Sequence, residues 1–212
     1  MKNIALIGAG GKMGCRLSAN LAKSDFDTRH VEVSEVGRKR LQDELGISCV
    51  DIEVALDNVD AVILAVPDTL IGKIAAQIEP SLPGGAMVVV LDAAAPFAGH
   101  LPVRDDLVYF ITHPCHPPIF NDETEMDAKR DYFGGAYAKQ SIVNALMQGP
   151  EESYALGEAV GKAIYAPIAS SYRVTVEQMA LLEPGLSETI CATLLAVMRE
   201  AMDEVVDRGA GA

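Results

Sequence analysis

The amino-acid sequence predicts an α/β fold, with an N-terminal doubly wound parallel sheet followed by a C-terminal helical segment. Three features of the 212 residues support it. The chain opens with an apolar run, a glycine turn and a helical stretch; short apolar runs then alternate with segments of helical periodicity; and residues 175–208 have a helical pattern. Half of the residues (50%) are hydrophobic, so the chain can bury a substantial core.

The glycine turn is the most informative single motif. Residues 4–7 form the first predicted strand, and the sequence GAGGKMG leads from it directly into a helix. A buried strand, a tight turn and a helix N-terminus make a Rossmann-type site for a dinucleotide pyrophosphate, because backbone N–H groups bind the phosphates. Met13 holds the place of the usual third glycine and Gly14 follows it; a turn that binds no ligand is the alternative. The residues expected to contact the cofactor are Gly8, Gly10, Gly11, Lys12, Met13 and Gly14.

An acidic residue after the glycine turn indicates which cofactor binds. Glu32 lies 24 residues past Gly8, near the end of a second strand predicted at 30–33. An acidic side chain about 20 residues beyond the glycines hydrogen-bonds the adenosine ribose and repels a 2′-phosphate, which favours NAD over NADP. Arg38 follows soon after and keeps NADP open. The alternative for Glu32 is an ordinary exposed residue at a strand end.

Composition excludes several classes of partner. The formal net charge of −13 argues against binding to nucleic acid or to an anionic membrane. The four cysteines show no C-x-x-C spacing, which is typical of a reduced cytoplasm. No segment approaches roughly 18 consecutive apolar residues, the length of a membrane span, and the apolar N-terminal run lacks a signal-peptide cleavage pattern. We therefore expect a soluble cytoplasmic protein.

Further strands are predicted at 61–66, 87–91, 107–111, 141–147 and 168–174, and helices at 35–45, 69–82 and 151–165. Ligands bind at the carboxyl ends of parallel strands. This rule selects the loops 8–14, 67–69, 92–96 and 112–118, and places Pro67, Asp68 and Asp92 beside the cofactor. For Asp92, capping of a turn is an equally weighted alternative.

The last part of the chain departs from the alternating pattern. A polar excursion, with the character of a flap, spans about 121–137, and the final helix is expected to break at Pro184–Gly185. We predict two domains, a NAD-binding domain at 1–172 and the start of a helical domain for substrate binding or dimerisation at 173–212; for the latter, a truncated domain and a naturally short one are both open. The apolar face of the final helix needs a partner chain or further sequence, which indicates a homodimer.

A histidine pair follows the predicted strand 107–111. His113 and His116 flank Cys115 among prolines, where substrate should lie. Imidazoles there can act as general base, alkoxide stabiliser or metal ligand; a hydrogen-bonded structural turn is the alternative. We expect Cys115 to be a small buried thiol rather than a nucleophile, because the sequence identifies no activating partner.

Two further side chains are candidates. Lys139 could bind a substrate carboxylate or be a solvated surface lysine. Glu183 and Ser187 share a helix face if the helix continues past Pro184. A carboxylate beside an imidazole could bind a divalent metal and polarise a hydroxy-ketone, and helix capping is the alternative of equal weight.

Several segments together resemble a known family. The glycine loop, AVPD, LDAAAP, THPCHPPIFNDET, KQSIVNALMQGPEE and EQMALLEPGLSE are similar to D-apionate oxidoisomerases, NAD-dependent enzymes of the 6-phosphogluconate dehydrogenase-like and ketol-acid reductoisomerase-like superfamily. The resemblance implies oxidation of D-apionate, a branched sugar acid, at its 2-hydroxyl and rearrangement to 3-oxo-isoapionate. A divalent metal assists the related reductoisomerase reaction.

The same resemblance assigns roles to individual residues. It implies NAD at the loop 8–14 and Glu32, metal or substrate at His113 and Glu183, and assisting catalytic roles for His116 and Lys139. Family chains continue beyond the point where this one ends. Two alternatives stay open, a hydroxy-acid or prephenate-type dehydrogenase that oxidises without rearrangement, and a non-catalytic NAD-binding protein.

Overall fold

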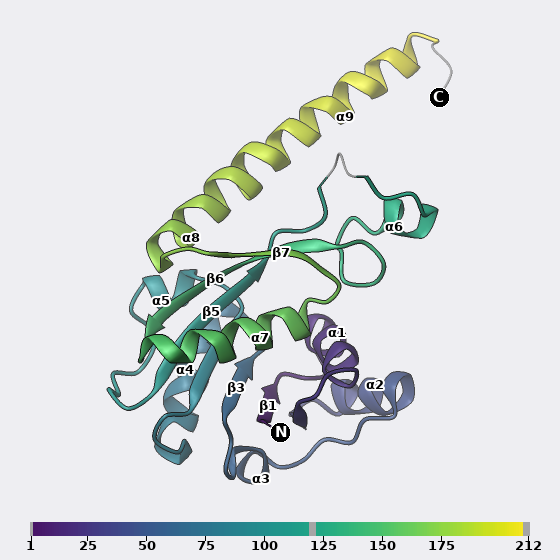
Figure 1. Cartoon of the computed structure of the whole chain (residues 1–212). Helices are drawn as coiled ribbons and strands as arrows, with labels where there is room; N and C mark the ends of the chain where they lie inside the picture. The colour runs from purple at the N-terminus through teal and green to yellow at the C-terminus, as the bar shows by residue number, and fades with distance from the viewer. Residues whose placement is uncertain (1, 119–121, 210–212) are drawn as a thin grey trace.

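A computed structural model describes residues 2–118 and 122–209 of the chain. The described residues form one seven-stranded sheet in the order β2-β1-β3-β4-β5-β6-β7, covered by helices on both faces (Figure 1). The doubly wound α/β fold predicted from the sequence is confirmed. Its first four strands are parallel, and they are β1 (Asn3–Ile7), β2 (Asp27–Val31), β3 (Ala61–Leu64) and β4 (Met87–Val90).

Each face of the sheet has its own hydrophobic core. The core on one face contains Leu17, Leu41 and Val160, and the core on the other face contains Ile71 and neighbouring apolar side chains. The inner strands β1, β3 and β4 are buried on both faces, which explains why they are continuous apolar runs in the sequence. The helices of the first face are α1 (Lys12–Leu21), α2 (Glu35–Leu45) and α7 (Tyr154–Ile164). Those of the second are α3 (Ile52–Leu56), α4 (Asp68–Ile78), α5 (Ala94–Phe97) and α8 (Val176–Leu182).

The last two strands run opposite to the others, which corrects the prediction of a wholly parallel sheet. β5 (Val108–Pro114) is parallel to β4, but β6 (Gln140–Gln148) pairs antiparallel with β5, and β7 (Ile168–Arg173) pairs parallel with β6. β5 ends at Pro114 and β6 begins at Gln140, at the same edge of the sheet. A parallel return would need a crossover to the opposite edge, so the chain comes back in the reverse direction.

The C-terminal helix is continuous, so the predicted break at Pro184–Gly185 is wrong. α8, the π-helical segment η3 (Glu183–Cys191) and α9 (Ala192–Asp207) follow without a gap and project away from the sheet (Figure 1). A proline lacks the backbone N–H and its ring collides with the carbonyl four residues earlier in an α-helix. The π turn moves the hydrogen bond to the fifth residue, which lets the helix pass Pro184.

Smaller predictions shift by a few residues. β2 ends at Val31, so Glu32 follows the strand directly. The predicted turn at 92–96 contains α5. The polar excursion holds one helical turn, α6 (Met126–Arg130), and its residue 121 lies outside the described residues. The predicted domain boundary at 172–173 falls at the end of β7, and the division into two domains stays a prediction.

Candidate active site

The glycine loop is shaped by close approach of neighbouring backbone. Gly8 has a φ of +82°, and a Cβ on it would lie 2.3 Å from the carbonyl oxygen of Ala65. A Cβ on Gly14 would lie 2.1 Å from the Gly8 oxygen, so Gly14 takes the helix-packing part of the usual third glycine. Gly11 differs, because its Cβ would meet only the Gly8 oxygen, at 3.4 Å. The loop therefore leaves room at the N-terminus of α1, which fits a dinucleotide diphosphate.

Glu32 is held at the edge of this loop. Its side chain is buried (8% exposed), one carboxylate oxygen accepts the Gly10 N–H at 2.8 Å, and the other accepts the Ser34 N–H at 2.8 Å. The alternative of an ordinary exposed residue is therefore wrong. The nearby arginines are engaged with backbone, since Arg38 donates to the Glu32 carbonyl and Arg40 donates to the Gly10 carbonyl at 2.9 Å. Each carboxylate oxygen keeps a lone pair for a ribose hydroxyl, which fits NAD.

A cavity of about 440 Å³ extends from the glycine loop along the carboxyl ends of the parallel strands. We call it the cofactor-side cavity. The structure brings into it most of the residues that the sequence predicted beside the cofactor. The lining residues predicted from the sequence as cofactor contacts or catalytic residues are Gly11, Lys12, Met13, Pro67, Asp68, Asp92, His113 and His116.

His113 lies at the far end of this cavity, held from both sides of its ring. Nδ1 lies 2.7 Å from the carbonyl oxygen of Leu91, and Nε2 lies 3.0 Å from a carboxylate oxygen of Glu183. A carbonyl oxygen can only accept, so Nδ1 carries a proton and Nε2 is the atom that gains or loses one. Burial alone would lower the pKa of His113, but the bond and charge of Glu183, assisted by Leu91 and Asp92, raise it above its usual value.

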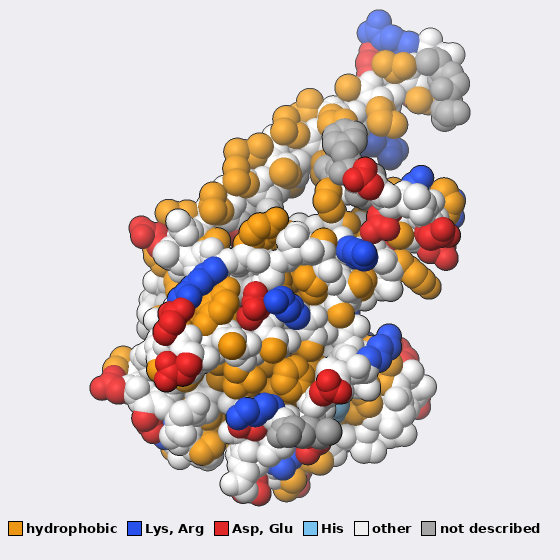
Figure 2. All heavy atoms as spheres, viewed as in Figure 1, with side chains coloured by type: hydrophobic (Ala, Val, Ile, Leu, Met, Phe, Trp, Pro, Cys, Tyr) orange, Lys and Arg blue, Asp and Glu red, His pale blue; other side chains and the backbone are white. Residues whose placement is uncertain are grey.

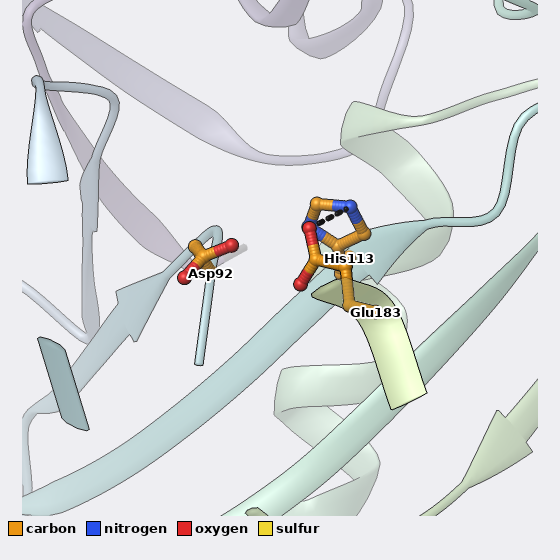
Figure 3. Close-up of side chains that lie close together, drawn as sticks. All are labelled: Asp92, His113 and Glu183. Atoms are coloured by element: carbon orange, nitrogen blue, oxygen red, sulfur yellow. Dashed lines mark ion pairs between the residues drawn. The ribbon is translucent and has the colours of Figure 1, made fainter. Parts of the chain in front are cut away.

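Asp92 completes a cluster with this pair. One ligand atom from each of Asp92, His113 and Glu183 lies within 4.8 Å of the others, although the three residues come from different elements (Figure 3). Asp92 also accepts the Ala94 N–H at 2.6 Å, so it caps α5 and reaches the cluster. Burial, and then the charge of Asp92, raise the pKa of neighbouring Asp68. One imidazole and two carboxylates at this separation fit the coordination shell of a divalent cation.

A second cavity, of about 420 Å³, lies on the other side of His113. We call it the substrate-side cavity. β5 and β6 form one wall. The other wall is the continuous helix of α8, η3 and α9 (residues 176–207), which we call the long helix. His113, Pro114 and His116 line both cavities, so the two meet at the histidine loop. The remaining lining residues are Cys115, Val143, Val174, Met179, Leu182, Glu183, Leu186, Ser187 and Glu188.

Comparisons with known proteins agree with this arrangement. The chain is 74% identical over 208 residues to D-apionate oxidoisomerase of Cupriavidus necator, covering 98% of this chain and 75% of that protein. It is 68% identical over 209 residues to D-apionate oxidoisomerase of Rhizobium rhizogenes, covering 99% and 76%. The chain belongs to the D-apionate oxidoisomerase family. Residues 121–212 also match the family described as phosphogluconate dehydrogenase (decarboxylating) C-term.

A solved structure supports both the fold and the cofactor of the family. It is the crystal structure of a semialdehyde dehydrogenase NAD-binding protein from Cupriavidus necator in complex with calcium and NAD. The chain matches it with a TM-score of 0.95 and 73% identity, over 100% of this chain and 76% of that one. The Rossmann-type fold is therefore confirmed, and NAD binding by a close family relative supports NAD here.

The remaining predicted residues lie in different settings. His116 is exposed, with Nδ1 3.1 Å from the carbonyl oxygen of Phe133. The side chain of Lys139 is exposed and lines neither cavity, while its backbone N–H donates to Glu123 at 3.3 Å. Cys115 is exposed, so the prediction of a buried thiol is wrong. Partial desolvation and the charge of Glu183 raise the pKa of its thiol, which disfavours a nucleophilic role.

Sequence reasoning missed two side chains near the site. Tyr165 is fully buried, lines the cofactor-side cavity and donates to the Thr112 carbonyl at 3.2 Å. Phe133 contacts both Lys12 and His116. Tyr165 ends a predicted helix and Phe133 lies in a polar excursion, so neither stands at a strand end, the signal that marked the other residues.

Proposed function

We propose that this chain oxidises D-apionate at its 2-hydroxyl with NAD and rearranges the product to 3-oxo-isoapionate. The observation that carries the proposal is the position of His113, where the cofactor-side and substrate-side cavities meet. A group there can act on a substrate hydroxyl beside the nicotinamide. The names of relatives at 74% and 68% identity supply the substrate.

His113 is suited to accept the proton of that hydroxyl. Because Nδ1 donates to the Leu91 carbonyl, the basic lone pair belongs to Nε2. Glu183 faces the same Nε2, so it stabilises the imidazolium by accepting the Nε2–H, and the substrate hydroxyl replaces the Glu183 carboxylate at Nε2 when its proton is transferred. The pair is partly withdrawn from water, which strengthens this effect.

NAD would be held by the glycine loop, Glu32 and the strand-end residues Pro67, Asp68 and Asp92, and a divalent cation by Asp92, His113 and Glu183. When bound, NAD would supply the acceptor for the hydride of C2, and the cation would supply a Lewis acid for the carbonyl oxygen. The cation and the proton compete for the same Nε2 lone pair, so His113 serves one of these roles at a time. His116 and Lys139 stay proposed as assisting residues, and the geometry favours His116.

The test is to incubate the protein with D-apionate and NAD, with and without EDTA, following NADH absorbance and determining the product by NMR. NADH together with a rearranged 3-oxo acid is the expected result. Activity lost to EDTA and restored by a divalent cation would assign His113 as a ligand; activity indifferent to EDTA would assign it as the base. NADH from another hydroxy acid but none from D-apionate would overturn the substrate.

The two alternatives give different outcomes. A simple hydroxy-acid or prephenate-type dehydrogenase would form NADH and an unrearranged oxo acid, so the NMR spectrum separates it. A non-catalytic NAD-binding protein would bind cofactor with no NADH formed from any hydroxy acid. The enclosed histidine–carboxylate cluster between two cavities favours an enzyme.

We also propose that a second copy of the chain covers the long helix. Within residues 183–209 no side chain is buried, and apolar side chains run along this helix (Figure 2). By length and composition, Val176–Asp207 could also cross a membrane. The first turns of this helix, however, pack against the sheet, because Met179 belongs to one of its hydrophobic cores and Glu183 contacts His113. This packing favours a protein partner over lipid. Sedimentation should give a dimer, and a stable monomer would refute this. A cytoplasmic location stays a prediction.

A further inference from the structure

The substrate-side cavity lacks the charge that a sugar acid needs. Its described lining contains Glu183 and Glu188 and neither lysine nor arginine. In the cofactor-side cavity, Lys12 is the one lysine or arginine among the described lining residues. A substrate carboxylate placed deep among the carboxylates would be repelled, and a cation held by them would be taken up by the reacting hydroxyl, so the substrate carboxylate should lie toward the end that both cavities share.

Phe133 gathers the side chains of Lys12 and His116 at that shared end. The ammonium of Lys12 lies 5.4 Å from the centre of the Phe133 ring, within the range of a cation–π contact. The imidazole of His116 meets the same ring edge to face, at 5.5 Å between centres, and its Nδ1 contacts the Phe133 carbonyl. One residue thus holds Lys12 from the glycine loop and His116 from the histidine loop.

The segment that carries Phe133 is itself fixed. One carboxylate oxygen of Asp131 accepts the N–H groups of Ala136, Tyr137 and Ala138, at 3.0, 2.8 and 3.1 Å. Burial alone would raise the pKa of Asp131, but these backbone bonds lower it below its usual value. Arg16, one turn beyond Lys12 on α1, donates to the Gly134 carbonyl. The loop 131–138 is therefore anchored to the helix that begins at the glycine loop.

His116 has a backbone conformation that residues other than glycine seldom adopt. Its φ of +57° lies in the left-handed region, which is uncommon for a residue other than glycine and often marks a functional site. With Nδ1 donating to the Phe133 carbonyl, Nε2 is the ring nitrogen left to meet a ligand, and the imidazolium form can donate its Nε2–H to an anion. No carboxylate pairs with the Lys12 ammonium among the described residues, so both groups are available to an anion.

We propose that Lys12 and His116, positioned by Phe133, bind the carboxylate of the substrate. This deepens the proposed function and rests on it. The diphosphate of NAD is the competing anion for Lys12, but the backbone N–H groups of the first turn of α1 serve it. The ammonium lies over the Phe133 ring beside His116, which lines the substrate-side cavity as well. Phe133 is a positioning residue, since it acts through Lys12 and His116.

The first test is the Lys12→Met variant, with Lys23→Met as the control on an exposed lysine just beyond the same helix. Losing one charge-assisted hydrogen bond should raise KM for D-apionate roughly 10- to 100-fold, with little change in kcat or in the Kd of NADH measured by fluorescence. Lys23→Met should leave all three unchanged. A raised Kd for NADH with an unchanged KM would overturn the proposal and assign Lys12 to the diphosphate.

The second test separates positioning from packing. Phe133→Ala should raise KM for D-apionate about as much as Lys12→Met, while Phe133→Tyr, which keeps the ring, should restore it. Equal KM values for the two Phe133 variants would overturn the positioning role.

A third measurement does not depend on the identity of the substrate. Glycolate added to the NADH complex should shift the NMR signals of the His116 ring, whereas uncharged ethylene glycol should not, and Lys12→Met should abolish the shift. If D-apionate gives no NADH but glycolate still shifts His116 in a Lys12-dependent way, the proposed substrate fails and the carboxylate site stands. Absence of any glycolate shift in the unsubstituted protein would overturn the site itself.

Discussion

The two cavities that meet at His113 are built in different ways. The cofactor-side cavity is formed mainly by the glycine loop and the ends of β3 and β4, where backbone geometry determines what fits. The substrate-side cavity is formed by the histidine loop, β6 and the long helix, where side chains from distant parts of the sequence converge. We call the walls of the cofactor-side cavity the backbone cradle, and those of the substrate-side cavity the side-chain assembly.

This difference predicts which property, NAD binding or turnover, a substitution in each cavity should impair. Changes in the backbone cradle should weaken binding of NAD or the fold itself and leave the chemistry of the bound complex alone. Changes in the side-chain assembly should slow turnover and leave NAD affinity alone. Because His113 belongs to both cavities, the distinction can be tested there from both sides.

The largest effect should follow the His113→Ala substitution. Removing the base or ligand should lower kcat roughly 10²- to 10⁴-fold, while the Kd of NADH, read by fluorescence, stays near that of the unsubstituted protein. His100→Ala is the matched control, because His100 is exposed and lines neither cavity. Turnover like that of the unsubstituted protein in both His113→Ala and Glu183→Ala would sink the assignment of the site.

Glu183→Gln should have the next largest effect. The substitution keeps the shape but removes the charge that stabilises the imidazolium, so kcat should fall roughly 10- to 100-fold. The pKa of His113 should also fall, because Glu183 supplies the main interaction that raises it. NMR titration of the EDTA-treated protein measures this pKa directly. An unchanged His113 pKa in Glu183→Gln would show that the contact does not act electrostatically.

The same pair makes a signed prediction for stability. The raised pKa of folded His113 means that the folded state binds its proton more tightly than the unfolded chain. This contribution is fully present below the unfolded pKa of about 6.5 and is lost as pH rises through the folded pKa. Urea unfolding should therefore show Glu183→Gln losing stability at low pH and approaching the unsubstituted protein at high pH. The opposite trend would mean that the charged imidazole is not the stabilised form.

The backbone cradle is also the part that the sequence allowed to be predicted. The spacing of the glycines, the position of Glu32 and the strand-end loops depend on local geometry, so Gly8, Asp68 and Asp92 lie where the patterns placed them. Even the departure from the usual motif has a local explanation, since Gly14 supplies the close packing that Met13 could not.

The side-chain assembly could be predicted only in part. His113 and Glu183 were paired as metal or substrate ligands, and the structure brings them to 3.0 Å. The reversal of β6 was missed, because strand direction depends on how the excursion returns and not on apolar pattern. The continuity of the helix past Pro184 was missed because the rule for proline in α-helices does not cover a π turn. Phe133 was missed because its neighbours are distant in sequence.

A matched glycine pair tests whether the cradle serves fold and cofactor through different residues. Gly14→Ala should destabilise the protein by about 1–3 kcal/mol, because the added methyl meets backbone that cannot move aside. Gly11→Ala should keep nearly the same Tm and raise the Kd of NADH, because its methyl enters the space left for the diphosphate. Thermal unfolding and NADH titration on both variants decide it. Equal losses of stability would mean that Gly11, too, is a packing residue.

The smallest expected effect is that of substituting Glu32. It separates two roles of the carboxylate, which are binding the cofactor ribose and holding the N–H groups of Gly10 and Ser34. Glu32→Gln should raise the Kd of NADH several-fold, because the ribose loses a charged acceptor. NADPH should respond in the opposite direction, since the carboxylate that repels its 2′-phosphate is gone. Glu35→Gln, an exposed residue at the start of α2, is the control. If both cofactors weaken equally, Glu32 acts only by holding Gly10 and Ser34, and cofactor choice must come from elsewhere in the cradle.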